Sequence, residues 1–195
     1  LSRTLMPVGA YEKPQIREIA EKAGLLVAHK SDSQDICFVP DHDYAGFIER
    51  ETGRVYKPGN FVDTQGNVLG QHRGIIHYTI GQRKGLGITA ATPLFVKEIR
   101  PETNQVVICR DEELFSDTCY ISNMNYMAEA SINPDTPAVG KIRYSHRGAG
   151  CKLTPLDNGM IKCVFDEPQR AMTPGQAAVF YQDDYVLCGG TIEKM

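Results

Sequence analysis

Apolar residues recur at helical spacing in two stretches near the start of this chain. Residues 14–24 begin with a proline, which suits a first helical turn, and end at a glycine, so we expect a helix there. Residues 41–51 place Tyr44, Phe47 and Ile48 on one helical face. This spacing predicts a second helix that packs through that face.

Short alternating segments separated by turn residues fill the chain from residue 53 onward. Residues 59–70 predict a hairpin, and residues 92–100 and 105–110 predict two strands joined by a turn. Six further strands are expected at residues 119–127, 138–144, 151–155, 160–165, 177–181 and 185–192. Strands at such short intervals favour a closed antiparallel barrel.

The predicted fold is therefore mainly β with a few helices. An apolar run at residues 25–28 is typical of a strand, and residues 1–9 suit a short strand and turn. A helix followed by a strand is typical of the tail end of an α/β domain, which we expect over residues 1–40. We expect a small central β-rich domain over residues 41–103 and a C-terminal antiparallel β-barrel over residues 104–195.

The chain has 195 residues, of which 42% are apolar, and this is enough for one large or two small globular cores. No apolar run is long enough to cross a membrane and no signal peptide is present, so we expect a cytoplasmic protein without membrane partners. Because Leu1 is not an initiator Met and the first residues resemble the inside of a domain, we expect a piece of a longer protein.

Positive charge is distributed unevenly. The formal net charge is −3, yet the segments between Asp63 and Glu98 and between Asp135 and Asp157 contain no acidic residue. Their basic residues are Arg73, Arg83, Lys84, Lys97, His72 and His77 in the first segment and Lys141, Arg143, His146, Arg147 and Lys152 in the second. Two basic segments on an acidic chain indicate a local polyanion site.

Residues 71–88 form a glycine-rich stretch that carries Arg83 and Lys84. Glycines let a backbone approach another molecule closely, so one interpretation is a phosphate or RNA-backbone contact. The other interpretation is a glycine-rich turn with a solvated basic tip. The stretch lacks the Gly-Lys-Ser/Thr ending of a nucleotide phosphate loop.

Residues 30–40, KSDSQDICFVP, pass from five polar residues directly into a short apolar run, with Cys37 at the junction. Buried strands rarely begin with so many hydrogen-bonding side chains, so we expect an ordered loop. A thiol at such a boundary can react with a substrate, whereas a thiol deep in a core is inert. Free cysteine is also among the most buried residue types, so a structural Cys37 is the competing interpretation.

The cysteines contain no C-x-x-C pair and no Cys/His cluster with zinc spacing, so no metal site is predicted. Cys109, Cys163 and Cys188 lie in apolar runs, which indicates core positions. Cys151 lies in a basic segment, and its environment is left open. Because the chain is long and its cysteines are spread along it, reduced cytosolic thiols are expected.

Four stretches carry a resemblance to a known family: SDSQDICFVP, GNFVDTQGNVLGQHRGIIHYTIGQRKGLGI, KIRYSHRG and FDEPQRAMTPGQAAVFY. Together they resemble the tRNA-specific 2-thiouridylase (MnmA/TrmU) family over essentially the whole chain. Members of that family place sulfur on carbon 2 of the wobble uridine in certain tRNAs. The resemblance implies three parts: an ATP-pyrophosphatase domain, a small central domain and a C-terminal β-barrel like the second domain of elongation factor Tu. The SGGxDSS-type ATP loop of the family is absent from this sequence.

The resemblance implies a role for Cys37. ATP, with Mg, would adenylate the uridine oxygen in the parent enzyme, and a persulfide on the cysteine that matches Cys37 would deliver its outer sulfur to the activated carbon. A second cysteine outside this sequence would release that sulfur or close a disulfide with Cys37, and a relay protein would donate the sulfur. This chain alone is expected to bind no cofactor and to be inactive, because the adenylation residues are missing.

For tRNA, the resemblance points to Arg143 and Tyr144 in a barrel strand and to Gln176 in TPGQ. Arg83 and Lys84 are further candidate tRNA contacts because of their charge in the glycine-rich stretch. Arginine can pair with a phosphate, tyrosine can stack on an unpaired base and glutamine can read a base edge. Because neighbouring residues of a strand face opposite ways, one of Arg143 and Tyr144 is expected to point inward.

Three function classes stay open. The first, which the resemblance favours, is the sulfur-carrying and tRNA-binding part of a 2-thiouridylase. The second is a non-catalytic RNA-binding β-barrel module. The third is a structural or protein-interaction barrel, which would show no salt-dependent RNA binding. The expected nucleic-acid partner is tRNA and not DNA.

Overall fold

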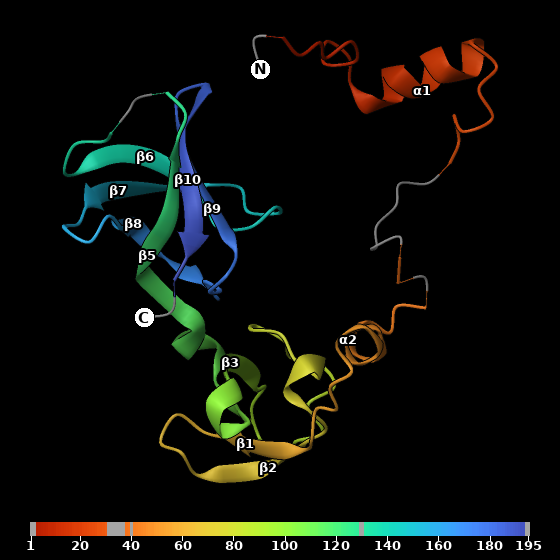
Figure 1. The fold of residues 1–195 in the computed structure, drawn as a ribbon. Helices are drawn as coiled ribbons and strands as arrows, with labels where there is room; N and C mark the ends of the chain where they lie inside the picture. Colours follow the sequence, from red (N-terminus) through yellow and green to blue (C-terminus); the bar gives the residue numbers. More distant parts are fainter. Residues whose placement is uncertain (1–2, 31–37, 40, 129–130, 194–195) are drawn as a thin grey trace. The chain divides into compact units, whose positions relative to one another are not determined.

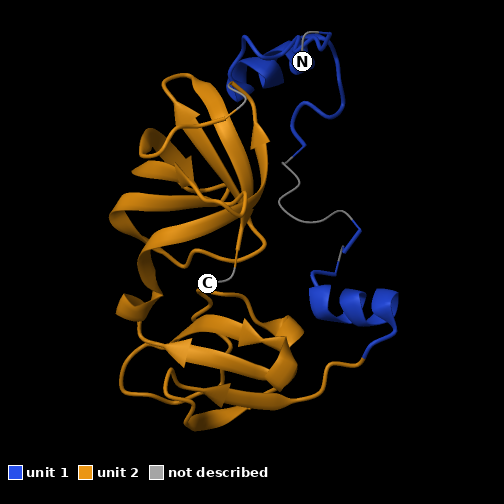
Figure 2. Cartoon of the chain, turned by 60° about the vertical axis from the view of Figure 1, so that its left-hand side comes forward, with its two compact units in different colours: residues 1–54 blue, residues 55–195 orange. Residues whose placement is uncertain are grey.

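The computed structural model describes residues 3–30, 38–39, 41–128 and 131–193. The chain divides into two compact units, residues 1–54 and residues 55–195, which Figure 2 colours separately. In the described residues the fold is mainly β with two α-helices, as the sequence predicts (Figure 1).

Helix α1 (Lys13–Lys22) confirms the first predicted helix. The backbone N–H of Glu12, which precedes it, donates to Oε1 of Gln15 at 2.8 Å and so satisfies a group that lies outside the helical pattern. The strands predicted at residues 25–28 and 1–9 are wrong, because the described residues there form turns and bends. A strand needs a partner for its backbone groups, and an apolar run supplies none by itself.

Helix α2 (Tyr44–Thr52) confirms the second predicted helix. Oδ1 of Asp43 accepts a hydrogen bond from the backbone N–H of Gly46 at 3.0 Å, which caps the first turn. Gly53 ends the helix with a positive φ of 64°, a conformation that favours glycine. The ring of Phe47, on the predicted packing face, lies 5.2 Å from the ring of Phe38.

The first part of the unit formed by residues 55–195 is a four-stranded sheet. Its strands are β1 (Gly59–Val62), β2 (Val68–His72), β3 (Phe95–Arg100) and β4 (Gln105–Cys109), in the order β2-β1-β4-β3. The β1–β2 and β3–β4 pairs are antiparallel and confirm the predicted hairpin and strand pair, whereas β1 and β4 are parallel. Strand β4 begins after residue 103 and belongs to this sheet.

The short 3₁₀ helices in this unit connect its strands. They are η1 (Ile75–His77), η2 (Pro101–Thr103) and η3 (Asp111–Leu114). The sheet core is formed by Phe61, Tyr78, Leu86, Val96, Val106 and Ile108. Leu86 comes from the glycine-rich stretch, so this stretch is anchored in the core.

His72 is a buried core residue and not part of a basic surface. Its Nε2 donates to the backbone oxygen of Asn104 at 3.1 Å, and its Nδ1 accepts from the N–H of Gly74 at 3.1 Å. The rings of Phe61 and Tyr78 pack edge-on against it at 5.4 and 5.7 Å. Burial lowers the pKa of His72, so the neutral imidazole is favoured, and counting His72 among the basic residues of its segment is wrong.

The second part of the unit is a closed antiparallel barrel, which confirms the predicted architecture. Its strands are β5 (Phe115–Tyr126), β6 (Thr136–Lys141), β7 (Ala149–Pro155), β8 (Ile161–Arg170), β9 (Ala177–Gln182) and β10 (Tyr185–Ile192), in the order β10-β5-β8-β7-β6-β9 (Figure 1). Side chains from all six strands and from nearby residues fill the barrel, among them Ile121, Leu153, Phe165, Phe180 and Leu187.

All five described cysteines, Cys109, Cys119, Cys151, Cys163 and Cys188, are free and buried. The core positions predicted for Cys109, Cys163 and Cys188 are confirmed, and Cys151 is also a core residue. Burial raises the pKa of Cys109 and of Cys188 to about 11. The described residues contain no group of three or more His, Cys, Asp or Glu side chains that could hold a metal ion.

Within the described ranges, the search for a helix of sufficient length and hydropathy to cross a membrane finds none.

The buried, neutral His72 predicts a pH dependence of stability. Its pKa in the folded state lies below the value of about 6.5 in the unfolded chain, so the unfolded state takes up the proton first as pH falls. Stability is therefore fully present above pH 6.5 and is lost as pH drops from there toward the folded pKa. In His72→Gln, whose amide supplies a donor and an acceptor but does not titrate, the thermal midpoint should fall less between about pH 7 and pH 5. Circular dichroism measures the thermal midpoint of each protein at each pH. If the midpoint falls equally with pH in His72→Gln and in the unmodified chain, His72 is not the group responsible.

Candidate RNA-binding surface

The register of the barrel strands brings two of the predicted sequence motifs to one end of the barrel. Lys141, the last residue of β6, pairs with Val179 near the start of β9. Phe115, the first residue of β5, pairs with Arg170, the last residue of β8. The connections formed by residues 142–148 and 171–176 therefore leave the barrel at the same end.

Arg143 and Tyr144 lie in the first of these connections and not in a strand. Strand β6 ends at Lys141, Ile142 is buried, and the backbone N–H of His146 bonds to the carbonyl of Arg143 at 3.0 Å in a turn. Arg143 and Tyr144 are both exposed, and Tyr144 is fully so, with 106% relative exposure. The prediction that one of them points inward is wrong, because the strand pairing ends before it can orient them.

Two contacts join this connection to the end of β8. Nη1 of Arg143 donates to the backbone oxygen of Arg170 at 3.0 Å. Nε2 of His146 lies 2.9 Å from Oε1 of Gln169. A guanidinium carries five N–H donors, so the bond to Arg170 leaves most of the Arg143 fork available to a ligand.

Arg170 is a further basic residue at this end. Its Nε donates to Oδ1 of Asp111 at 3.0 Å, and its Nη2 forms an ion pair with the same oxygen at 2.9 Å. Its guanidinium lies 5.0 Å from the ring centre of Phe95. The side chains of the ion pair are 33% and 48% exposed, so the pair contributes about 0–1 kcal/mol to stability. Arg170 was not among the predicted site residues, although its place within the long FDEPQRAMTPGQ stretch was a usable signal.

Arg83 and Lys84 occupy the exposed tip of the glycine-rich stretch. The Gln82 side chain braces this turn, since its Oε1 accepts from the N–H of Thr79 at 2.9 Å and its Nε2 donates to the carbonyl of Lys84 at 2.9 Å. The backbone of Gln82 also accepts a hydrogen bond from Val96 of β3 at 2.9 Å. The tip is therefore held in a defined position on the sheet.

A cleft of about 500 Å³ brings arginines from both parts of the unit together. It is lined by Arg83, Thr92, Pro93, Phe95, Arg110, Asp111, Glu112 and Arg170. Arg143 reaches this group through its bond to the backbone of Arg170. Lys84 and Gln176 are exposed but do not line the cleft, although Gln176 lies in the connection at the same barrel end.

Cys37 lies outside the described residues, so its predicted reactivity stays a prediction. The two described residues that follow it differ in exposure: Phe38 is 63% exposed, whereas Val39 is buried.

The arginines and the exposed Tyr144 are side chains of the kinds that bind RNA. Arginines supply charge and hydrogen-bond forks for phosphates, and an exposed tyrosine supplies a face on which an unpaired base can stack. The arrangement is that of a candidate RNA-binding surface on a β-barrel protein.

Three family models match successive parts of the chain. They are described as a tRNA methyl transferase HUP domain over residues 1–41, a tRNA methyl transferase PRC-barrel domain over residues 45–110 and an aminomethyltransferase beta-barrel domain over residues 116–192. The chain is also similar to curated proteins named tRNA-specific 2-thiouridylase MnmA. It is 58% identical to the one from Lachnoclostridium phytofermentans, 50% to that from Carboxydothermus hydrogenoformans and 48% to that from Acetivibrio thermocellus.

These matches cover 99–100% of this chain and 53–54% of each relative, so the chain spans about half the length of the curated relatives it matches. The model descriptions speak of methyl transfer, whereas the relatives are named for thiolation. The similarity to the relatives is the more specific of the two, because each match extends over essentially the whole chain at 48–58% identity. The chain belongs to the tRNA-specific 2-thiouridylase family.

The position of Arg143 predicts a salt-dependent contribution to RNA binding. Arg143→Ala should weaken binding of a tRNA and lower the slope of log affinity against log salt by about one unit, because one counterion fewer is released. Fluorescence anisotropy over a range of salt concentrations measures both effects. Lys162→Ala is the matched control, since Lys162 lies near the start of β8, at the other end of the barrel. An equal loss for both variants would remove Arg143 from the interface.

The exposure of Tyr144 predicts a stacking contribution that does not depend on its hydroxyl. Tyr144→Ala should weaken RNA binding by about 1–3 kcal/mol, the range for one stacked base, while Tyr144→Phe keeps the ring and most of the affinity. Thermal midpoints should be unchanged in both variants, because the side chain is fully exposed. If Tyr144→Phe loses as much affinity as Tyr144→Ala, stacking is not the contact.

Proposed function

We propose that this chain is the tRNA-binding and sulfur-carrying part of a tRNA 2-thiouridylase. The enzyme transfers sulfur from a cysteine persulfide to the ATP-activated wobble uridine of tRNA. The observation that carries the tRNA-binding role is the group of arginines at one end of the barrel, with Tyr144 exposed beside Arg143. The names of the relatives support the choice of tRNA as the polyanion.

The two kinds of side chain on this surface have different tasks. Arg83 and Arg143 neutralise phosphates and hold the RNA backbone, which supplies affinity without sequence information. Tyr144 stacks on an unpaired base, a contact that is available only where the RNA leaves its duplex. A wobble base must be turned out of its loop to enter a catalytic pocket, so a separate surface that holds the stem suits this reaction.

The sulfur step is proposed for Cys37. The outer sulfur of a Cys37 persulfide forms a bond to carbon 2 of the uridine, and the adenylate formed from ATP leaves with the former uridine oxygen. A second cysteine thiol, outside this chain, then attacks the sulfur of Cys37. The bond to the transferred sulfur breaks, 2-thiouridine is released, and a disulfide with Cys37 is formed. ATP and its Mg are proposed to bind in the part of the enzyme that lies outside this chain. A thiol reductant reduces the disulfide, and a relay protein then transfers the next persulfide sulfur to the free thiol of Cys37.

An RNA-binding barrel without a catalytic contribution is the second candidate. All five described cysteines are buried, so a thiol that carries sulfur in this chain must be Cys37. If Cys37 carries no sulfur, RNA binding is the role that is left for the chain. The experiment on Cys37 therefore separates the two candidates.

In the complete enzyme, Cys37→Ser should abolish 2-thiouridine formation while folding and tRNA binding survive. Serine keeps the size and polarity of the side chain but cannot hold a persulfide. Retardation of the tRNA product in a mercury-containing gel measures thiolation. Cys163→Ser is the matched control: its buried hydroxyl should cost about 1–3 kcal/mol of stability and leave thiolation intact. Normal thiolation by the Cys37→Ser enzyme would leave the RNA-binding candidate alone.

A further inference from the structure

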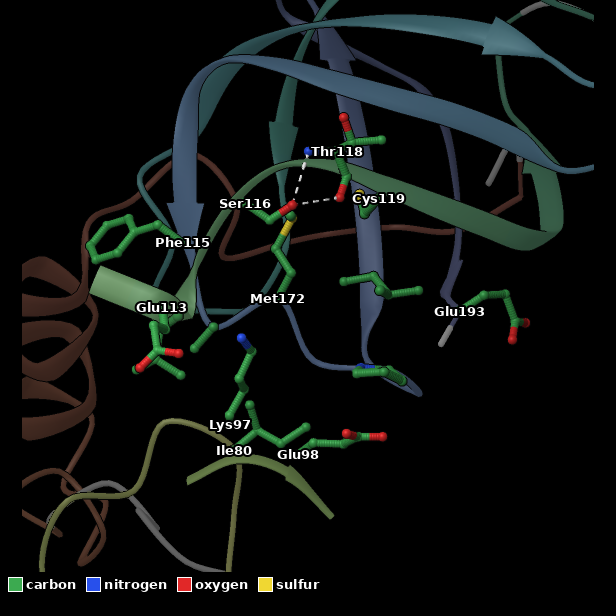
Figure 3. A pocket seen from close by; sticks show the side chains of 14 residues that line it. Ile80, Lys97, Glu98, Glu113, Phe115, Ser116, Thr118, Cys119, Met172 and Glu193 are labelled. Atoms are coloured by element: carbon green, nitrogen blue, oxygen red, sulfur yellow. Dashed lines mark hydrogen bonds between the residues drawn. The ribbon is translucent and has the colours of Figure 1, made fainter. Parts of the chain in front are cut away.

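An open cleft of about 390 Å³ lies at the junction between the four-stranded sheet and the barrel, between residues of β3, the start of β5 and the connection that follows β8. Figure 3 shows its lining, with Ile80 and Lys97 on one side and Ser116 and Thr118 on the other. Beside this cleft, specific contacts join the sheet to the barrel.

Arg170 supplies the best defined of these contacts. It is the last residue of a barrel strand, and its guanidinium lies over Phe95 of the sheet. The same guanidinium forms a hydrogen-bonded ion pair with Asp111 of the connecting segment η3. Its backbone carbonyl accepts the hydrogen bond from Arg143. One residue therefore touches the sheet, the connection and the barrel loop that carries Arg143.

A close contact between two glycine-containing motifs lies beside this bridge. A β-carbon placed on Gly81 would lie 3.3 Å from Cβ of Ala171 and 3.5 Å from Nη1 of Arg170. Ala171 has a positive φ of 54°, and its N–H bonds to the carbonyl of Leu114 at 2.8 Å. A larger residue at position 81 would push the glycine-rich stretch of the sheet away from Arg170 and Ala171 of the barrel.

We propose that Arg170, held by Asp111 and Phe95, is a positioning residue that fixes the sheet on the barrel, so that Arg83 and Arg143 contact one RNA together. This inference rests on the proposed function and names the device that assembles its binding surface. Arg83 belongs to the sheet and Arg143 to the barrel, so neither can fix the position of the other. The bridge through Arg170 links them.

Because Asp111 is acidic, the direction in which its removal changes RNA affinity tests the proposal. Asp111 carries negative charge in the same cleft as three arginines, and so does Glu112. If charge alone mattered, removing either carboxylate would strengthen binding of an anionic RNA. If Asp111 holds Arg170 in place, removing its carboxylate weakens binding instead.

The experiment compares tRNA binding by the full chain carrying Asp111→Ala, Asp111→Asn or Glu112→Ala. Asp111→Ala should lower the affinity about tenfold. Asp111→Asn should lose less, because its amide oxygen still accepts from Arg170, although both variants have the same charge. Glu112→Ala should bind equally well or more tightly. Unchanged thermal midpoints exclude unfolding as the cause.

Two further measurements test the positioning role by other means than the sign of the affinity change. In the Asp111→Ala background, Arg83→Ala should cost much less affinity than it costs in the unmodified chain, because Arg83 no longer shares the RNA with Arg143. Gly81→Ala should weaken RNA binding through the steric clash, whereas Gly87→Ala, with open space around its β-carbon position and a similar positive φ, serves as its control.

The outcomes separate this inference from the proposed function. If the unmodified chain does not bind tRNA, the proposed function fails and the positioning role fails with it. If the unmodified chain binds tRNA but Asp111→Ala binds equally well or more tightly, the positioning role is overturned and the proposed function stands. Equal affinities of Asp111→Ala and Asp111→Asn would also overturn it.

Discussion

The strand register of the barrel is the constraint on which the rest of the structure depends. Backbone hydrogen bonds fix which residues stand opposite each other, and a shift by one position would turn every side chain of a strand to the other face. With β8 in its observed register, its last residue, Arg170, reaches the start of β5 and the connecting segment that contains Asp111. The basic surface is thus a consequence of backbone pairing. The strands bring its arginines together, so no attraction between the arginines themselves is required.

Local chemistry explains what the sequence could predict. The helices and the hairpin depend on residues a few positions apart, such as the cap formed by Asp43 and Gly46, and these signals can be read from the chain alone. The barrel strands were also predictable, since each alternates apolar residues that face the core. The run at residues 25–28 shows the limit of this reasoning, because apolar residues make a strand only where another strand accepts their backbone groups.

The candidate site was less predictable because its contacts join distant parts of the chain. Arg83 and Arg143 were recognised from charge and from the family resemblance, but the role of Arg170 depends on Asp111, 59 positions away in the sequence. Burial also removed one residue, His72, from the predicted basic residues. His72 counts as basic by type, yet its neutral ring is favoured in the core of the sheet.

The closing pair of the barrel also has a consequence for folding. Strand β5 pairs with β10, and Ile121 of β5 lies opposite Ile192 of β10. The first barrel strand can therefore pair with β10 only after β10 has left the ribosome. Pairings between such distant segments form slowly and expose strand edges in the meantime. The connection after β8 is held in part by hydrogen bonds between Ile192 and the backbone of Gly175 and Gln176. A nascent chain in which β10 has not yet been made lacks these hydrogen bonds, so the connection that carries Gln176 takes its final position only after β10 has paired.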